Sequence, residues 1–123
     1  MDRYSSNSDF EHKIGYSRAV KEKDFVFVSG TTGFDYNSMT IATDIVEQAE
    51  QAFLNIIKVL EEAGTNIDNV VRVRYIVTKK EYFEPCWPVF QKYFGKSRPA
   101  ATAIIAQLID DRMKIEIEVT ASL

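Results

Sequence analysis

Charged and apolar residues alternate in two stretches of the chain, VVRVRYIVT and KIEIEVTA, and the charged members are the first candidates for chemistry. In a β-strand, alternate side chains point to the same face. Arg72 and Arg74 therefore share one face of the first strand, and Glu116 and Glu118 share one face of the second. A guanidinium group can hold the carboxylate of a ligand. Charge balance between neighbouring strands or subunits explains the same pattern, so both interpretations stay open.

Other residue types that often carry chemistry have a structural explanation here. Cys86 is the only cysteine and stands between Pro85 and Trp87, which favours a packed apolar side chain over a nucleophile. His12 is the only histidine and lies in a polar segment, where we expect it to be solvated. One histidine and one cysteine cannot supply a closed set of metal ligands. The SGTTG stretch lacks the Lys-Ser/Thr pair of a phosphate-binding loop, so we expect neither a metal nor a cofactor.

The composition limits both the size of the fold and its partners. With 123 residues, of which 46% are hydrophobic, the chain is expected to form a single domain over residues 1–123. The formal net charge is −3, so the excess of Lys and Arg that binds a phosphate backbone is missing. The polar N-terminal residues show neither the apolar run of a signal peptide nor a membrane-spanning stretch. We expect a cytoplasmic protein without a nucleic-acid or membrane partner.

The first half of the chain is predicted to contain a β-hairpin followed by a long helix. DFVFVSG, residues 24–30, predicts a strand that runs into a turn at Ser29-Gly30, and YSRAVKEKD before it predicts the partner strand. The following TTGFDYNSMT is expected to be a loop or a short edge strand. A helical stripe begins near Thr43, with Asp44 at the N-cap and Gly64 just past the end. Its apolar members are Ile45, Val46, Ala49, Ala52, Phe53, Ile56, Ile57 and Leu60.

The second half of the chain predicts three more strands and a shorter helix. NVVRVRYIVT, residues 69–78, alternates as a strand, with Val71, Val73, Tyr75 and Val77 on one face. YFEPCWPVFQKYFG predicts a helix whose prolines belong to the first turn. The aromatic residues expected in the core are Trp87, Phe90, Tyr93 and Phe94. RPAATAIIAQLI and MKIEIEVTASL predict two final strands joined at a turn over residues 110–112.

Two helices can cover only one face of the resulting sheet. Alternate residues of the last strand, from Ile115 to Val119, point toward them. The opposite face would carry Ile76, alternate members of FVFV, and the small residues Ala101 and Ala103, mixed with the four charged residues. An exposed sheet face with this apolar content usually marks an interface. We therefore expect a homo-oligomer whose subunits pack through their sheets.

These elements, in this order, resemble the Rid (YjgF-like) family over residues 15–121. The resemblance is carried by Tyr16-Ser17, the strand ending at Ser29-Gly30, QAEQAFLNIIKVLEEAG, VVRVRYIVT, Pro99-Ala100 and the closing EIE. It implies an α+β, chorismate-mutase-like fold with a mixed β-sheet and two helices on one face. It also implies a homotrimer with the sheets inward and small-molecule clefts between subunits. The implied activity is hydrolysis of reactive enamines and imines, such as 2-aminoacrylate, to a keto acid and ammonia.

The family's site residues match this chain only in part. The resemblance implies that Glu116 positions the attacking water. The positions expected to line the cleft are Tyr16, Ser29, Gly30, Ala101, Thr102 and Ala103. Such members have an arginine directly after the Pro-Ala pair that holds the substrate carboxylate, but Ala101 occupies that position here. Losing a charge-assisted hydrogen bond costs on the order of 1.5 to 3 kcal/mol, or roughly ten- to over a hundred-fold in binding, so the standard amino-acid-derived imine is expected to be a poor substrate.

The missing arginine leaves three outcomes open. Another arginine, Arg98, Arg72 or Arg74, could restore carboxylate binding. The ligand could instead lack a carboxylate, and Glu116 with a water would still act on an imine or carbonyl. The leading hypothesis is therefore a Rid-like deaminase with altered substrate specificity. The alternative is a non-catalytic trimer that binds a small metabolite or has a regulatory role. Endoribonuclease activity, an older description in this family, is disfavoured by the acidic charge balance.

Overall fold

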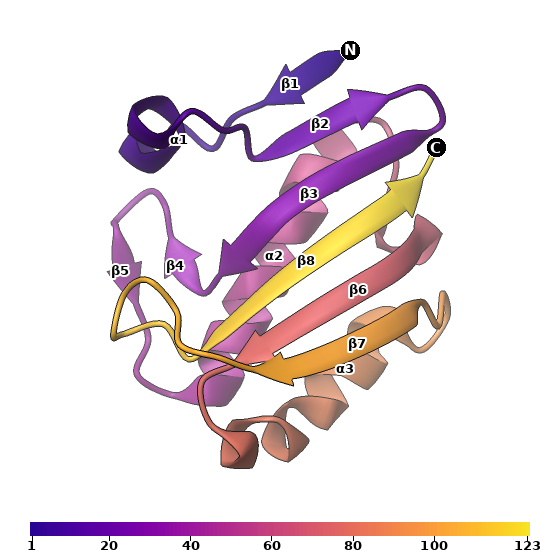
Figure 1. Cartoon of the computed structure of the whole chain (residues 1–123). Helices are drawn as coiled ribbons and strands as arrows, with labels where there is room; N and C mark the ends of the chain where they lie inside the picture. The colour runs from indigo at the N-terminus through magenta and orange to yellow at the C-terminus, as the bar shows by residue number, and fades with distance from the viewer.

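A computed structural model describes residues 1–123. A six-stranded sheet forms its centre, and the helices α2 and α3 cover one face of the sheet (Figure 1). The strand order is β1-β2-β3-β8-β6-β7. All neighbouring strands are antiparallel except β6 and β7, which are parallel. The prediction of a mixed sheet with helices on one face is confirmed.

The strands of this sheet are β1 (Asp2–Tyr4), β2 (Ala19–Glu22), β3 (Phe25–Thr32), β6 (Val70–Val77), β7 (Ala100–Ile105) and β8 (Ile115–Ser122). A small hairpin beside the sheet consists of β4 (Phe34–Asp35) and β5 (Thr40–Ile41). The α-helices are α1 (Asp9–Ile14), α2 (Ile45–Glu62) and α3 (Trp87–Phe94). Three short 3-10 helices span Ile67–Asn69, Lys80–Tyr82 and Glu84–Cys86. No helix is long and apolar enough to cross a membrane.

The N-terminal segment forms β1 and α1, which the polar sequence pattern did not predict. The Ser8 hydroxyl accepts a hydrogen bond from the Phe10 N–H, and the helix ends at Gly15, where φ is 91°. The Glu11 carboxylate accepts hydrogen bonds from the Ser6 N–H. A serine followed by a glutamate three residues later is a known start signal for a helix, and the left-handed φ at the end favours glycine. The Ser8-to-Glu11 spacing could therefore have identified α1.

The long helix α2 begins and ends as predicted. The Asp44 carboxylate accepts a hydrogen bond from the Glu47 N–H at 3.0 Å, and Gly64 follows the helix with a φ of 89°. Its buried face also contains Gln48, which the apolar pattern does not include. The Gln48 amide donates to the carbonyls of Ala42 and Arg112 and accepts from the Lys114 N–H. This polar contact fixes the loop between β7 and β8 against α2.

The core lies between the sheet and the helices α2 and α3. Alternate residues of β6 and β8 are buried there, from Val73 to Val77 and from Ile115 to Ala121. The rings of Tyr75 and Phe90 stack with their centroids 4.2 Å apart. Each large apolar side chain buried in this way stabilises the fold by about 1.5 to 3 kcal/mol. Trp87 was expected in this core but is 52% exposed at the start of α3, so that prediction is wrong.

Two predictions about the sheet faces are also wrong. The pairing of β6 with β8 is irregular between Val70 and Arg72, and Val71 is exposed instead of facing the helices. β7 pairs in parallel with β6, with Ala101 opposite Val73 and Ala103 opposite Tyr75. Directly opposite residues share a face, so both alanines lie on the helix side of the sheet. β6 and β8 separate β7 from the rest of the sheet, which makes β7 an edge strand.

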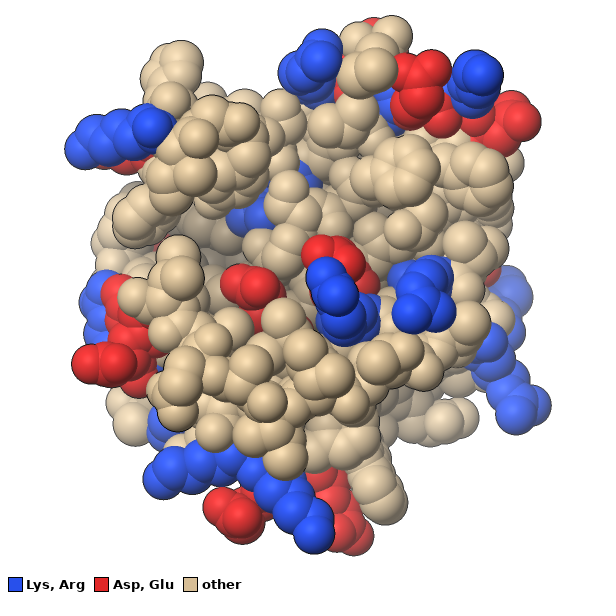
Figure 2. Space-filling view, in the orientation of Figure 1, with Lys and Arg blue, Asp and Glu red and all other residues tan.

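The uncovered face of the sheet combines apolar and charged side chains. Figure 2 looks onto this face and shows a few charged side chains within a largely uncharged surface. Phe25 and Phe27 alternate with buried residues of β3 and are 42% and 49% exposed. Arg74 forms an ion pair with Glu118 at 3.0 Å, which confirms charge balance for these two residues, whereas Arg72 and Glu116 join none of the ion pairs. The apolar side chains remain available for contact with another molecule.

Candidate functional site

An irregularity in β3 builds the first wall of the candidate site. The register of β3 against β8 shifts between Val28 and Thr31, so Ser29 and Gly30 leave the regular ladder. The Ser29 N–H donates to the Arg18 carbonyl at 2.9 Å, and its hydroxyl donates to the Ser17 carbonyl at 2.6 Å. A bulge of this kind redirects nearby side chains and often occurs beside functional sites. The segment before β2 therefore holds the bulge in place.

The Glu116 carboxylate lies directly against this bulge. A Cβ atom at position 30 would come within 2.5 Å of Glu116 Oε1 and 2.6 Å of its Cδ, so only glycine leaves room for the carboxylate as it stands. Glu116 is partly buried and takes part in none of the ion pairs of the structure. Burial raises the pKa of Glu116; Arg18 opposes this rise, Glu118 adds to it and Arg74 opposes it. Such a carboxyl is suited to accept and return a proton.

Arg18 lies behind the same wall and was not identified from the sequence. It is only 4% exposed. Its Nη2 donates to the Gly30 carbonyl at 2.5 Å, and its Nη1 donates to the Tyr36 hydroxyl at 2.9 Å. The guanidinium carbon lies 5.8 Å from the centre of the Tyr16 ring. Its place directly after Tyr16-Ser17 was the available signal, but its burial depends on two other segments, which contribute the Gly30 carbonyl and the Tyr36 hydroxyl.

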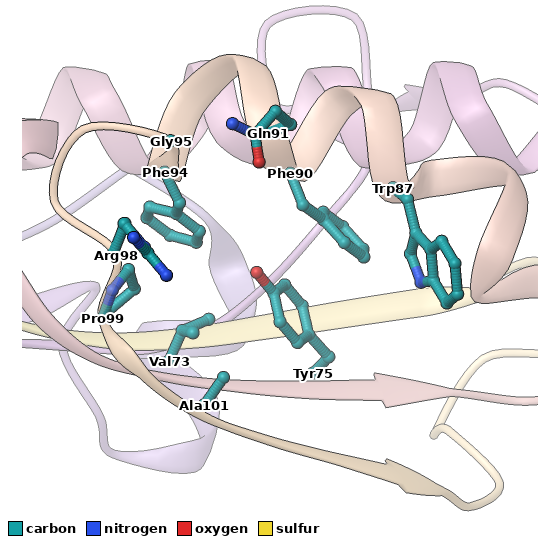
Figure 3. Close-up of a pocket in the computed structure, with 10 residues that line it drawn as sticks. All are labelled: Val73, Tyr75, Trp87, Phe90, Gln91, Phe94, Gly95, Arg98, Pro99 and Ala101. Atoms are coloured by element: carbon teal, nitrogen blue, oxygen red, sulfur yellow. The ribbon is translucent and has the colours of Figure 1, made fainter.

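Ala101 lies in a different part of the subunit, in a cleft between β7 and α3. The cleft has a volume of about 650 Å³. Val73, Tyr75 and Ala101 form its floor, the aromatic residues of α3 form its roof, and Arg98 with Pro99 closes one end (Figure 3). The exposed Trp87 stands at the other end. Six of the ten residues that line the cleft are hydrophobic, Gln91 adds a polar side chain, and Arg98 adds a cation at one end.

Of the three candidate arginines, Arg98 is the one that shares this cleft with Ala101. Arg98 joins none of the ion pairs of the structure and has a left-handed φ of 47°. Arg74 is paired with Glu118, and Arg72 donates to the Thr102 hydroxyl at 3.2 Å on the uncovered face. Arg72 and Arg74 therefore do not line the cleft within one subunit.

A single subunit separates the predicted site residues into two groups. The first group lies around the bulge and consists of Tyr16, Ser29, Gly30 and Glu116. The second group lies along β7 and consists of Arg98, Ala101, Thr102 and Ala103. Thr102 faces the uncovered side, whereas Ala103 lines a smaller cavity beside Trp87. No group of three or more His, Cys, Asp or Glu side chains is placed to hold a metal ion. The cleft beside β7 contains no member of the first group.

The fold and the sequence place the chain in a known class of α+β proteins. Its structure is similar to a crystal structure of a YjgF/YER057c/UK114 family member from Mycobacterium tuberculosis, with a TM-score of 0.90 and 35% identity over 99% of this chain and 98% of that one. It is also similar to the structure of RidA from an Antarctic Psychrobacter, with a TM-score of 0.86 and 28% identity over 100% of this chain and 96% of that one. The fold is therefore YjgF-like.

The sequence comparisons identify the family. Residues 7–123 match the family described as Endoribonuclease L-PSP. A RutC family protein from Pyrococcus abyssi is 35% identical over 107 residues, which cover 86% of this chain and 84% of the relative. The 2-iminobutanoate/2-iminopropanoate deaminase of Mus musculus is 30% identical over 107 residues, which cover 86% of this chain and 79% of the relative. The chain belongs to the Rid/YjgF/L-PSP family.

Proposed function

We propose that the protein hydrolyses reactive imines and enamines as a homotrimer of single-domain subunits. Each active cleft would join the Glu116 wall of one subunit to the Ala101 and Arg98 wall of its neighbour. The observation that carries the proposal is the Glu116 carboxylate, which is partly buried, free of ion pairs and fitted against Gly30. Relatives named 2-iminobutanoate/2-iminopropanoate deaminase, 30% and 32% identical, supply the reaction class.

The chemistry assigned to Glu116 is proton transfer. A water molecule adds to the carbon of the C=N bond while the carboxylate accepts one of its protons, which gives a tetrahedral carbinolamine. That proton passes to the nitrogen, which completes the neutral carbinolamine. The carboxylate then transfers the hydroxyl proton to the nitrogen, so the C–N bond breaks as the C=O bond forms, and ammonia leaves with a keto acid as the other product. General acid-base help of this kind contributes about a hundred- to ten-thousand-fold in rate. A pKa raised by burial moves the carboxyl closer to the neutral range, where such transfer is most efficient.

The substrate that fits best is an imino acid with an apolar side chain. Ala101 offers no cation, so the carboxylate is assigned to Arg98, which shares the cleft and has no ion-pair partner. The aromatic surface around Trp87 and Phe90 suits an aliphatic or aromatic substituent. A cleft of about 650 Å³ is within the usual range for small-molecule sites. On this proposal, the chain lacks the arginine expected at position 101 and binds the carboxylate with Arg98, three residues earlier.

The exposed apolar side chains support the trimer. Phe25 and Phe27 lie on the uncovered sheet face and are about half exposed, so burying the rest of each side chain is favourable by about 1 kcal/mol. A symmetric contact through the sheets would cover this face in every subunit. It would also bring the bulge of one subunit toward the edge strand of another, which the two-part site requires.

An imine decay assay tests the proposal. Imines are generated in situ from small and apolar amino acids with an amino-acid oxidase, and their lifetime is measured by trapping with semicarbazide. We expect Glu116→Gln to lower kcat by about a hundred-fold or more, and Arg98→Gln to raise KM roughly ten- to a hundred-fold. Ala101→Arg should improve turnover of the small imine. Lys96→Gln serves as the matched control, because Lys96 pairs with Asp68 outside the cleft. A folded trimer that accelerates the decay of no imine would refute the proposal.

A second function is favoured by the absence of an arginine at position 101. A trimer that binds a small keto acid, amide or aldehyde without turnover would show ligand-dependent thermal stabilisation and leave the ligand concentration unchanged. Measuring both quantities on the same samples separates the two functions, because only an enzyme depletes its ligand. Endoribonuclease activity is disfavoured, since the formal net charge is −3.

A further inference from the structure

Arg18 is a buried cation that has no ion-pair partner in the structure. It is 4% exposed, its Nε is buried without a hydrogen-bond partner, and none of the ion pairs of the structure includes it. Buried charges are normally paired, because removing a guanidinium from water is costly. An apolar residue would occupy the same position with a smaller desolvation free energy. The retained charge therefore points to a role outside stability.

The contacts of Arg18 converge on the Glu116 wall. One terminal nitrogen donates to the carbonyl of Gly30, the residue on which the Glu116 carboxylate rests. The other donates to Tyr36, and the planar group lies 5.8 Å from the centre of the Tyr16 ring. The planar guanidinium thus holds the Gly30 backbone, against which the Glu116 carboxylate lies, and also contacts the Tyr16 ring. A lysine could not make both hydrogen bonds in this fork geometry.

We propose that Arg18 is a positioning residue for Glu116, which holds the Ser29-Gly30 bulge in place and provides a positive charge behind the carboxylate. This inference rests on the proposed role of Glu116. The charge of Arg18 acts on Glu116, whereas the substrate carboxylate is assigned to Arg98. Arg18 itself is too buried to contact a substrate, so it acts through Glu116 and Gly30.

The other charged groups around Glu116 leave Arg18 as its main unpaired cation. Glu118 is two residues away on β8, and it is paired with Arg74 on β6. On β3 the residues beside Glu116 are Gly30 and Thr32, which carry no charge. The charges of Arg74 and Glu118 therefore largely cancel. Burial raises the pKa of Glu116, and Arg18 is the largest influence that lowers it.

The test is a titration of the Glu116 carboxyl by NMR in the full-length protein, with the carboxyl resonance assigned by comparison with Glu116→Gln. Arg18→Gln removes the charge, and Arg18→Lys keeps the charge but loses the fork. We expect the pKa of Glu116 to rise in Arg18→Gln and to stay near the wild-type value in Arg18→Lys. We expect kcat to fall about ten- to a hundred-fold in both variants, because a shift of the carboxylate near 1 Å has effects of that size. Arg112→Gln, which changes an exposed arginine paired with Asp110, is the matched control.

The titration separates this inference from the proposed function. An unchanged pKa and an unchanged Gly30 amide resonance in Arg18→Gln would overturn the positioning role, whether or not the protein hydrolyses imines. A wild type without activity would instead refute the proposed function and leave the titration result standing. If Arg18→Gln does not fold, Tyr36→Phe can be used instead, because it removes the hydroxyl that accepts a hydrogen bond from Arg18 Nη1 and keeps the charge of Arg18. That variant should lower kcat without moving the pKa, and an unchanged kcat would contradict the role.

Discussion

Replacing Gly30 by alanine should disable Glu116 without unfolding the protein. A Cβ at this position would lie 2.5 Å from Glu116 Oε1, whereas ordinary contacts begin at 3.4 Å, so the carboxylate must move by about 0.9 Å. A misplacement near 1 Å costs about a hundred-fold in rate, which corresponds to roughly 2.7 kcal/mol of activation free energy. The Gly30 backbone is not in the left-handed region, so alanine can adopt its conformation. The end of a glutamate side chain moves easily, and stability should change by less than about 1 kcal/mol.

The assay for Gly30→Ala is a double-mutant cycle with Glu116→Gln. Imine decay gives kcat for the wild type, the two single variants and the double variant, and urea unfolding gives the stability of each. If Gly30 acts through the carboxylate, the double variant should be no slower than Glu116→Gln alone. The reasoning is refuted if Gly30→Ala keeps the wild-type kcat, or if the two losses add fully.

Three further predictions concern stability and assembly. Because the folded pKa of Glu116 is raised, its contribution to stability is present below the unfolded pKa and is lost as pH rises through the folded pKa. Glu116→Gln should therefore unfold at a higher urea concentration than the wild type at neutral pH, and this difference should disappear near about pH 4. A variant that is less stable than the wild type at neutral pH would contradict this prediction. Gln48→Ala leaves two carbonyls and the Lys114 N–H without their partner, and it should lower the free energy of unfolding by about 3 kcal/mol in urea titrations, with a loss under about 1 kcal/mol counting against it. Phe27→Asp puts a charge on the uncovered face and should reduce the mass in sedimentation equilibrium to that of one chain, whereas an unchanged trimer mass would show that this face is not the interface.

Elements with strong local signals could be predicted from the sequence. The helix α2 carries its start at Asp44, its end at Gly64 and a continuous apolar stripe between them. The strands β3, β6 and β8 alternate clearly, and their buried residues follow the pattern apart from Val71. In these segments, neighbours within a few residues determine the conformation. The order of these elements also indicated the Rid (YjgF-like) family.

The arrangement of the site could not be predicted, because it depends on contacts between distant segments. The face of Ala101 and Ala103 is set by the parallel register with β6, which no local pattern reveals. The burial of Arg18 depends on the Gly30 carbonyl and the Tyr36 hydroxyl, which come from other parts of the chain. Trp87 has the helical spacing of a core residue, but its position at the first turn of α3 leaves it beside the cleft.

Each proposed active cleft combines walls from two subunits, and mixed trimers test this most directly. Glu116→Gln disables the first wall, and Ala101→Glu puts a negative charge where the substrate carboxylate would bind in the second. Each variant alone should be inactive. When equal amounts are unfolded together and refolded, about a quarter of the clefts should combine two intact walls, and activity should return to about a quarter of the wild-type level. Mixed trimers as inactive as either parent would show that both walls belong to one subunit and would contradict the account.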